Sequence, residues 1–188
     1  MKKGTVVLIV IIAVLAIIVL PAIGAYNNLV ALSEEVETAL SQIDNQLQRR
    51  NDLIPNLVNT VKGYASHEEE IFTSIADARS RLIGAGSLEE KAEASEQLSG
   101  ALSRLLAIAE NYPELKANEN FKQLSDELAG TENRIATARR DYNNAARKYN
   151  TSIRRFPTVI IANLFGFERY EYFEADESAR QAPEVNFD

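Results

Sequence analysis

The single histidine of the chain lies in the segment that most resembles a catalytic motif. His67 is followed by Glu68, Glu69 and Glu70, an order superficially similar to the zinc-binding helix of metalloproteases. Zinc catalysis of that type needs a second histidine one helical turn later, and Ile71 stands there. Acidic residues are common in the first turn of a helix, where they meet the positive end of its dipole. We therefore predict the start of a helix here and no metal site.

Other common active sites need residue types that the chain lacks. It contains no cysteine, which excludes thiolate nucleophiles, thiolate metal ligands and disulfides. A serine nucleophile needs a histidine base, and His67 lies in the acidic segment. Carboxylate pairs are left open by the 27 acids, but no pair is singled out by its spacing. We predict no catalytic residue, no cofactor and no metal.

Composition narrows the class of protein further. With 188 residues, the chain can hold one membrane anchor and one domain of ordinary size. Its formal net charge of −7 argues against a nucleic-acid partner, because neutralising phosphates requires a basic surface. Glycine and proline are scarce, with 8 and 5 residues, which favours long helices over a turn-rich β fold.

A membrane-spanning helix is predicted from Val6 to Ala25, a run without a charged residue. About 20 residues rising ~1.5 Å each cross the ~30 Å hydrocarbon core of a bilayer. The alternative is a cleavable signal peptide that begins with Lys2 and Lys3, but the apolar region of a signal peptide is shorter. The next basic residue after the span is Arg49, so the positive-inside rule places the N-terminus in the cytoplasm and the domain outside.

Beyond the span, apolar residues recur at alternating steps of three and four, which predicts an elongated antiparallel helical bundle. The first bundle helix begins at Tyr26 and is expected to kink or break near Asp52–Pro55, because proline removes a backbone donor. Ser66 and Ser87, each with a glutamate three residues later, have the spacing of a capping box and predict two further helix starts. The expected ends of these two helices are Gly84-Ala85-Gly86 and Tyr112-Pro113.

The last long helix has the clearest pattern, a coiled-coil-like heptad seam over about five repeats. Its residues are Phe121, Leu124, Leu128, Thr131, Ile135, Ala138, Tyr142, Ala145, Tyr149, Ser152 and Phe156, and Phe156-Pro157 is expected to close the helix. Tyr142-Asn143 and Tyr149-Asn150 lie one heptad apart in this seam. Packing in the chain's own core is the simpler interpretation of the tyrosines, and a seam between copies of the chain is the alternative.

An apolar run from Thr158 to Phe167 follows and is too short to span a bilayer. The predicted helix lengths return Phe156 to the foot of the first helix, so the run either faces the membrane or neighbouring copies, or caps the bundle's own core. The tail holds seven acids against two arginines and is expected to be irregular. The predicted parts are a basic stretch (1–5), a transmembrane helix (6–25), a helical-bundle domain (26–167) and an acidic tail (168–188).

Several residues are candidates for contact with other molecules. The polar stretch from Gln42 to Asp52 is either a recognition face or, in the simpler interpretation, a solvated helix face with weak ion pairs. The heptad seam and the apolar run supply the other candidates. The predicted interaction face consists of Arg49, Arg50, Tyr142, Tyr149, Phe156, Ile161 and Phe165.

A series of motifs in a fixed order resembles the bacterial LemA family over nearly the whole chain. The motifs are YNNLV from Tyr26, QID from Gln42, RRNDLIPNLV from Arg49, VKGYA from Val61, His67-Glu68, YPELKA from Tyr112, TENRIA from Thr131, Ala138-Arg139, Tyr142-Asn143, Tyr149-Asn150, Phe156-Pro157, Gly166-Phe167 and YFE from Tyr172. The resemblance implies one transmembrane helix and a helical-bundle domain, without established enzymatic activity or known catalytic or cofactor residues. Some relatives are associated with building specialised bacterial membranes. Descriptions of the family often place the domain in the cytoplasm, which is the alternative to the orientation predicted from charge.

We therefore predict an all-α, single-pass protein of the bacterial inner membrane, with membrane lipid as a partner and self-association into a homo-oligomer. The leading functional hypothesis is a non-catalytic scaffold that organises envelope proteins or the membrane. The alternative is a membrane-bound adaptor or sensor that presents a helical face to another envelope protein, such as a protease. The third hypothesis is an enzyme that uses buried carboxylates.

Overall fold

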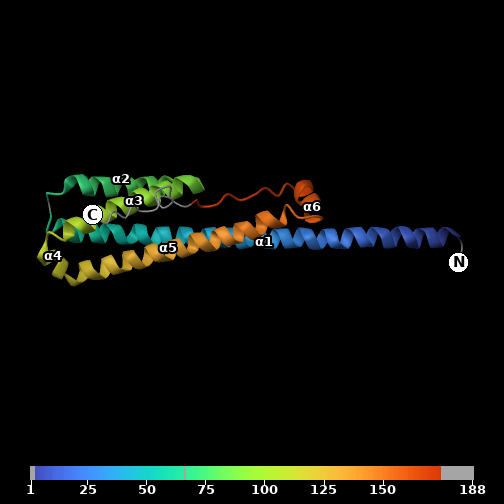
Figure 1. Cartoon of the computed structure of the whole chain (residues 1–188), viewed down its shortest axis with the longest axis horizontal. Coiled ribbons are helices and arrows are strands. Elements are labelled where there is room, and N and C mark those ends of the chain that lie inside the picture. Colours follow the sequence, from blue (N-terminus) through green and yellow to red (C-terminus); the bar gives the residue numbers. More distant parts are fainter. Residues whose placement is uncertain (1–2, 66, 175–188) are drawn as a thin grey trace, which may run out of the picture. The chain divides into compact units, whose positions relative to one another are not determined.

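The computed structural model describes residues 3–65 and 67–174, and these residues form six α-helices and no strand (Figure 1). The prediction of an all-α fold is confirmed. The helices are α1 (Lys3–Lys62), α2 (Glu69–Gly84), α3 (Leu88–Ala109), α4 (Pro113–Ala117), α5 (Glu119–Ser152) and α6 (Thr158–Phe165).

Two compact units make up the chain, and α1 and α5 each contribute to both. The first unit comprises Met1–Gln42 and Arg140–Glu171, and the second comprises Ile43–Arg139 and Tyr172–Asp188. Most of the predicted acidic tail, residues 175–188, lies outside the described residues.

In the described part of the chain, α1 is the helix that is long and apolar enough to cross a membrane. Most side chains described between Val6 and Ala25 are exposed within the chain. A soluble helix would bury an apolar stripe against its neighbours, whereas a lone helix in lipid keeps apolar side chains on all sides. The prediction of an N-terminal transmembrane helix therefore agrees with α1.

Of the kink or break predicted near Asp52–Pro55, the break is wrong, because α1 continues without interruption to Lys62. Ile54 and Leu57, on either side of the proline, are 1% and 0% exposed. Burying two such side chains contributes roughly 3–6 kcal/mol, at about 1.5–3 kcal/mol each. This gain offsets the ~3 kcal/mol that proline costs inside a helix.

The turn between α2 and α3 in the second unit follows its sequence signal closely. Ser87 Oγ accepts a hydrogen bond from the Glu90 backbone N–H at 3.1 Å, and the Ser87 N–H donates to Glu90 Oε2 at 3.2 Å. The Gly86 N–H donates to the same carboxylate oxygen at 2.7 Å. The predicted capping box at Ser87 is therefore confirmed, and it lets α3 start directly after α2 and pack against it (Figure 1).

The other helix boundaries of the second unit differ in detail from the prediction. α2 begins at Glu69 with Glu68 in the N-cap position and no side-chain hydrogen bond there, while Ser66 lies outside the described residues. α3 ends at Ala109, before the predicted end at Tyr112-Pro113, and Pro113 is the first residue of the short helix α4. Proline suits the first position of a helix, where its missing N–H would have no partner.

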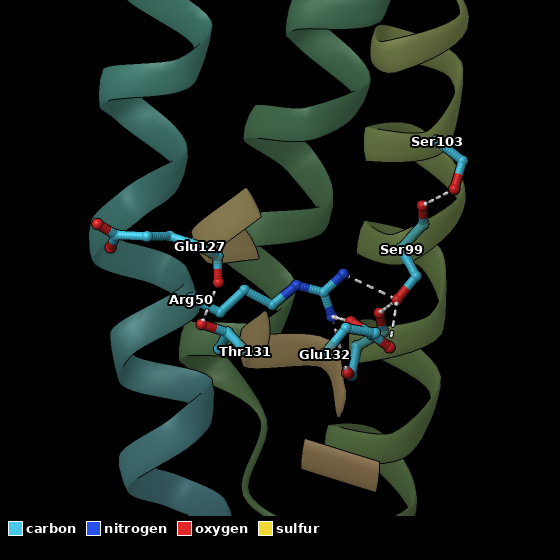
Figure 2. A network of polar contacts seen from close by, with 7 residues as sticks. Arg50, Ser99, Ser103, Glu127, Thr131 and Glu132 are labelled. Carbon is cyan, nitrogen blue, oxygen red and sulfur yellow. Dashed lines mark hydrogen bonds and ion pairs between the residues drawn. The ribbon is translucent and has the colours of Figure 1, made fainter. Parts of the chain in front are cut away.

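Three helices of the second unit meet at a buried arginine. Arg50 of α1 is 3% exposed and forms an ion pair with Glu132 of α5 at 2.8 Å. Its guanidinium also donates to Ser99 Oγ of α3 at 2.9 Å, as Figure 2 shows. Burial lowers the pKa of Arg50, and Glu132 partly opposes this shift. A buried charge requires such partners, so this contact specifies which faces of the three helices come together.

We predict that Glu132→Ala lowers the free energy of unfolding by roughly 1–2 kcal/mol, because it leaves the buried guanidinium without its carboxylate. The expected loss is below that of a fully buried pair, because the side chain of Glu132 is 49% exposed. Denaturant unfolding of the full chain in detergent measures the change.

The matched control is Glu127→Ala on the same helix. Glu127 pairs at 3.8 Å with Arg49, whose side chain is 53% exposed, so its removal should cost less than about 0.5 kcal/mol. Equal effects of the two variants would contradict the role of the Arg50 contact.

The first unit packs α1 against α5 through apolar and aromatic side chains. The buried set comprises Leu29, Val36, Tyr142, Ala145, Ala146, Tyr149 and Ile153. α5 ends at Ser152, earlier than the predicted end of the heptad seam, and Phe156 is 82% exposed rather than packed. Proline disfavours the α conformation in the residue before it, so the helix ends ahead of Phe156-Pro157.

Candidate functional site

In the first unit, Tyr26 contacts Phe165 of α6 and the nearby Phe167. We call these residues, together with the rest of α6 and the exposed Phe156 that precedes it, the foot. α6 is closed by Gly166, whose φ of 71° lies in the left-handed region that favours glycine. The N–H of Phe167 donates to the Ala162 carbonyl at 2.9 Å, which satisfies a backbone acceptor at the end of the helix. This closure turns the chain so that Phe167 follows α6 on the same side as Phe165, facing Tyr26.

Tyr26 is the first residue after the predicted span and contacts both ends of this closure. Its ring centroid lies 4.8 Å from that of Phe165 and 5.6 Å from that of Phe167, in tilted and edge-on arrangements. Such aromatic pairs are favourable beyond the area they bury. The helix lengths predicted a return of Phe156 to the start of the first bundle helix. The observed contacts with Tyr26 are those of Phe165 and Phe167, so the end of α6 lies where the apolar part of α1 ends.

Most of the large apolar side chains of the foot face away from the chain. Ile160 and Leu164 are 56% and 72% exposed, and Phe165 is 58% exposed despite its contact with Tyr26. Ala162 is buried against the unit, while Val159 and Ile161 are half-buried. Of the two alternatives for the apolar run, an outward-facing surface describes α6 better than a cap on the core.

A segment after α6, Phe167–Glu171, is fastened to α5 and is called the strap here. Asn150 holds the backbone of Tyr170 on both sides, because its Nδ2 donates to the Tyr170 carbonyl at 2.8 Å and its Oδ1 accepts from the Tyr170 N–H at 2.9 Å. The Tyr142 hydroxyl donates to the Glu171 carbonyl at 3.0 Å. The first residues of the predicted acidic tail are irregular, as expected, yet they are held in place.

Tyrosine rings support the same segment. The ring of Tyr170 meets that of Tyr149 edge-on at 5.0 Å, and its hydroxyl lies 2.9 Å from Ser33 Oγ and 3.2 Å from Glu37 Oε1 of α1. Burial raises the pKa of Tyr142, Tyr149 and Tyr170, so all three keep their protons at neutral pH. The strap therefore joins α1 and α5 in the first unit.

The structure separates the residues of the predicted interaction face. Tyr142 and Tyr149 are each 2% exposed and belong to the core of the first unit, which agrees with the simpler interpretation of the heptad seam. Arg50 is buried in the second unit, so it does not form a surface with its exposed neighbour Arg49. Of the remaining members, Phe156 is exposed just before α6, and Ile161 and Phe165 lie on α6.

Sequence reasoning missed Asn150, which is 6% exposed and holds the strap. The repeated Tyr-Asn dipeptides were a signal for it, but only the tyrosines received a role. No group of three or more histidine, aspartate or glutamate side chains in residues 3–65 and 67–174 is arranged to hold a metal ion. The site offers apolar surface and hydrogen-bonded support rather than a reactive group.

We predict that Asn150→Ala lowers the free energy of unfolding by about 1–3 kcal/mol, because two backbone groups of Tyr170 lose their partner. Asn144→Ala is the matched control on the same helix, since Asn144 only accepts from exposed Arg147 at 3.1 Å. Its expected cost is below about 0.5 kcal/mol. Thermal unfolding followed by circular dichroism compares the two, and similar melting temperatures would refute the role of Asn150.

Comparison with known proteins places the chain in a family. The model of the LemA family matches residues 39–187. The chain is 32% identical over 200 residues to magnetosome protein MamQ 2 of Paramagnetospirillum magneticum, with 92% of this chain and 74% of that protein covered. It is 30% identical over 201 residues to magnetosome protein MamQ of Magnetospirillum gryphiswaldense, with the same coverage of 92% and 74%.

A further relative carries the family's name. The chain is 27% identical over 162 residues to protein LemA of Metamycoplasma hominis, with 84% of this chain and 73% of that protein covered. The apolar helix α1 and these relatives together mark a membrane protein. The family match extends over most of the helical bundle and includes Arg50, Asn150 and α6, and the chain belongs to the LemA family.

Proposed function

We propose that the chain is a non-catalytic, membrane-anchored helical scaffold that self-assembles and organises envelope proteins or the membrane. The observation that carries this proposal is the continuity of α1 from the apolar run Val6–Ala25 into the bundle of the first unit. An unbroken helix holds the bundle beside it at a defined height above the bilayer. A defined height serves a structural role, and no constellation among the described residues suggests chemistry.

Self-assembly is supported by the exposure of the apolar run Val6–Ala25 of α1. Among the described residues, no other part of the chain buries the most apolar window of α1. A lone helix in lipid packs against lipid chains or against another helix, and every copy of the chain in the membrane carries the same apolar helix. The apolar faces of α1 are therefore the proposed contact between copies.

The relatives support a structural rather than an enzymatic role. Three of the similar proteins are named magnetosome proteins, and their names describe a part of a cellular structure instead of a reaction. The proposed location is the bacterial inner membrane, crossed once. Lys2 and Lys3 favour an N-terminus in the cytoplasm and the domain outside, with a cytoplasmic domain as the alternative.

We predict that single cysteines placed in turn at positions 9–20 of this cysteine-free chain form disulfide-linked dimers upon oxidation in native membranes. Dimer yield should peak at every third or fourth position, because one face of α1 meets its copy. Thr38→Cys, on an exposed part of α1 beyond the run, is the control and should give little dimer.

The pattern of cross-linking decides between the functional candidates. Uniformly low yield at all positions, together with a monomeric mass for the purified full chain, would refute self-assembly. If such a monomer were instead cross-linked to one heterologous envelope protein, the scaffold proposal would yield to the adaptor hypothesis.

A further inference from the structure

We propose that the foot docks into the bilayer surface, with α6 lying in the boundary between headgroups and acyl chains of an anionic membrane. The partner is lipid, and the docking surface consists of Phe156, Ile160, Leu164 and Phe165 with the preceding pair Arg154 and Arg155. This inference goes beyond the scaffold role, because it holds whether or not copies of the chain associate.

The end of α6 lies at the same level as the end of the membrane-spanning run. The run Val6–Ala25 is about as long as the hydrocarbon core is thick, so Tyr26 lies where α1 leaves the core. Tyrosine is favoured at this level, where its ring meets lipid and its hydroxyl meets water. Phe165 and Phe167 contact the ring of Tyr26, which places the end of α6 at the same level.

One face of α6 exposes large apolar side chains. Ile160 and Leu164 are separated by four residues and therefore lie on the same side of the helix, opposite the buried Ala162. Both are more than half exposed, and Phe156 is the most exposed large apolar side chain among residues 26–65 and 67–174. Water-exposed surface of this kind is costly, whereas the same side chains gain free energy at the acyl boundary.

Two arginines beside the apolar face favour anionic lipids. Arg154 and Arg155 are both exposed and directly precede Phe156, so two cations accompany the apolar face. Arg169 is exposed after α6, next to the exposed acids Glu168 and Glu171, which compensate it. Arginine side chains near a bilayer surface are attracted to anionic headgroups, and their apolar stems can lie along the acyl boundary.

A second copy of the chain is the competing occupant of this face. Lipid is favoured because the bilayer surface is present at the level of Tyr26 around every single copy, without any association. A contact between copies would also bring the exposed Arg154 and Arg155 of each copy toward those of its neighbour, and like charges at short range repel.

The test uses the full chain in lipid nanodiscs that contain one copy each, with a single cysteine at Leu164 carrying an environment-sensitive fluorophore. Thr38→Cys is the control on the same unit, about 18 Å along α1 from Tyr26 at 1.5 Å per residue. Lipids with a nitroxide near the headgroup, or near the end of the acyl chain, quench the fluorophore according to its depth.

We expect severalfold stronger quenching at Leu164 than at Thr38, with the shallow nitroxide more effective than the deep one. Ile160→Cys should behave as Leu164→Cys does, which guards against a defect of one variant. Quenching at both foot positions no stronger than at Thr38 would overturn the proposal. So would a foot that is shielded only when each nanodisc holds two copies, because the face would then bind a second chain.

Lipid charge is tested with the same labelled chain. Quenching at Leu164 should be stronger in nanodiscs of phosphatidylglycerol than of phosphatidylcholine, and the difference should shrink in the double variant Arg154→Gln, Arg155→Gln. Both arginines are exposed, so this variant keeps the fold. Equal quenching in the two lipids would overturn the assignment of an anionic partner.

Discussion

The position of the first unit at the membrane depends on one constraint. The apolar run Val6–Ala25 is about as long as the hydrocarbon core of a bilayer is thick. When Val6–Ala25 occupies the hydrocarbon core, Tyr26 lies at the edge of that core. Residues that contact Tyr26 therefore lie at the same level relative to the bilayer. Phe165 and Phe167 bring α6 to that height. The strap then links α6 to α5 through Asn150, so the end of the bundle is tied to the same level.

Much of this fold can be read from the sequence where a local pattern is sufficient. The apolar run, the three-four periodicity and the capping box at Ser87 are local signals, and the corresponding helices formed as expected. The break predicted at Pro55 is wrong because burial of Ile54 and Leu57 stabilises the continuous helix α1. That burial depends on contacts with other helices, which a local pattern does not contain. Phe156 continues the seam by spacing alone, whereas Pro157 disfavours the helical conformation in the residue before it.

The polar contacts were beyond sequence reasoning for a different reason. Arg49 and Arg50 are adjacent and identical in type, yet their side chains are 53% and 4% exposed. The difference arises from α3 and α5, which surround one arginine with Ser99 and Glu132 and leave the other at the surface. Such buried polar groups must be paired, so they select one arrangement of helices among those that the apolar pattern allows.

If α6 is packed against the point where α1 leaves the bilayer, these two helices must be close together in the membrane-embedded protein, and a distance between them can be measured there. Spin labels on cysteines at the exposed positions Asn27 and Asn163 report that distance by double electron–electron resonance in nanodiscs. We expect one short, narrow distance distribution. A broad distribution centred at long distances would show that α6 is not held at the end of the span.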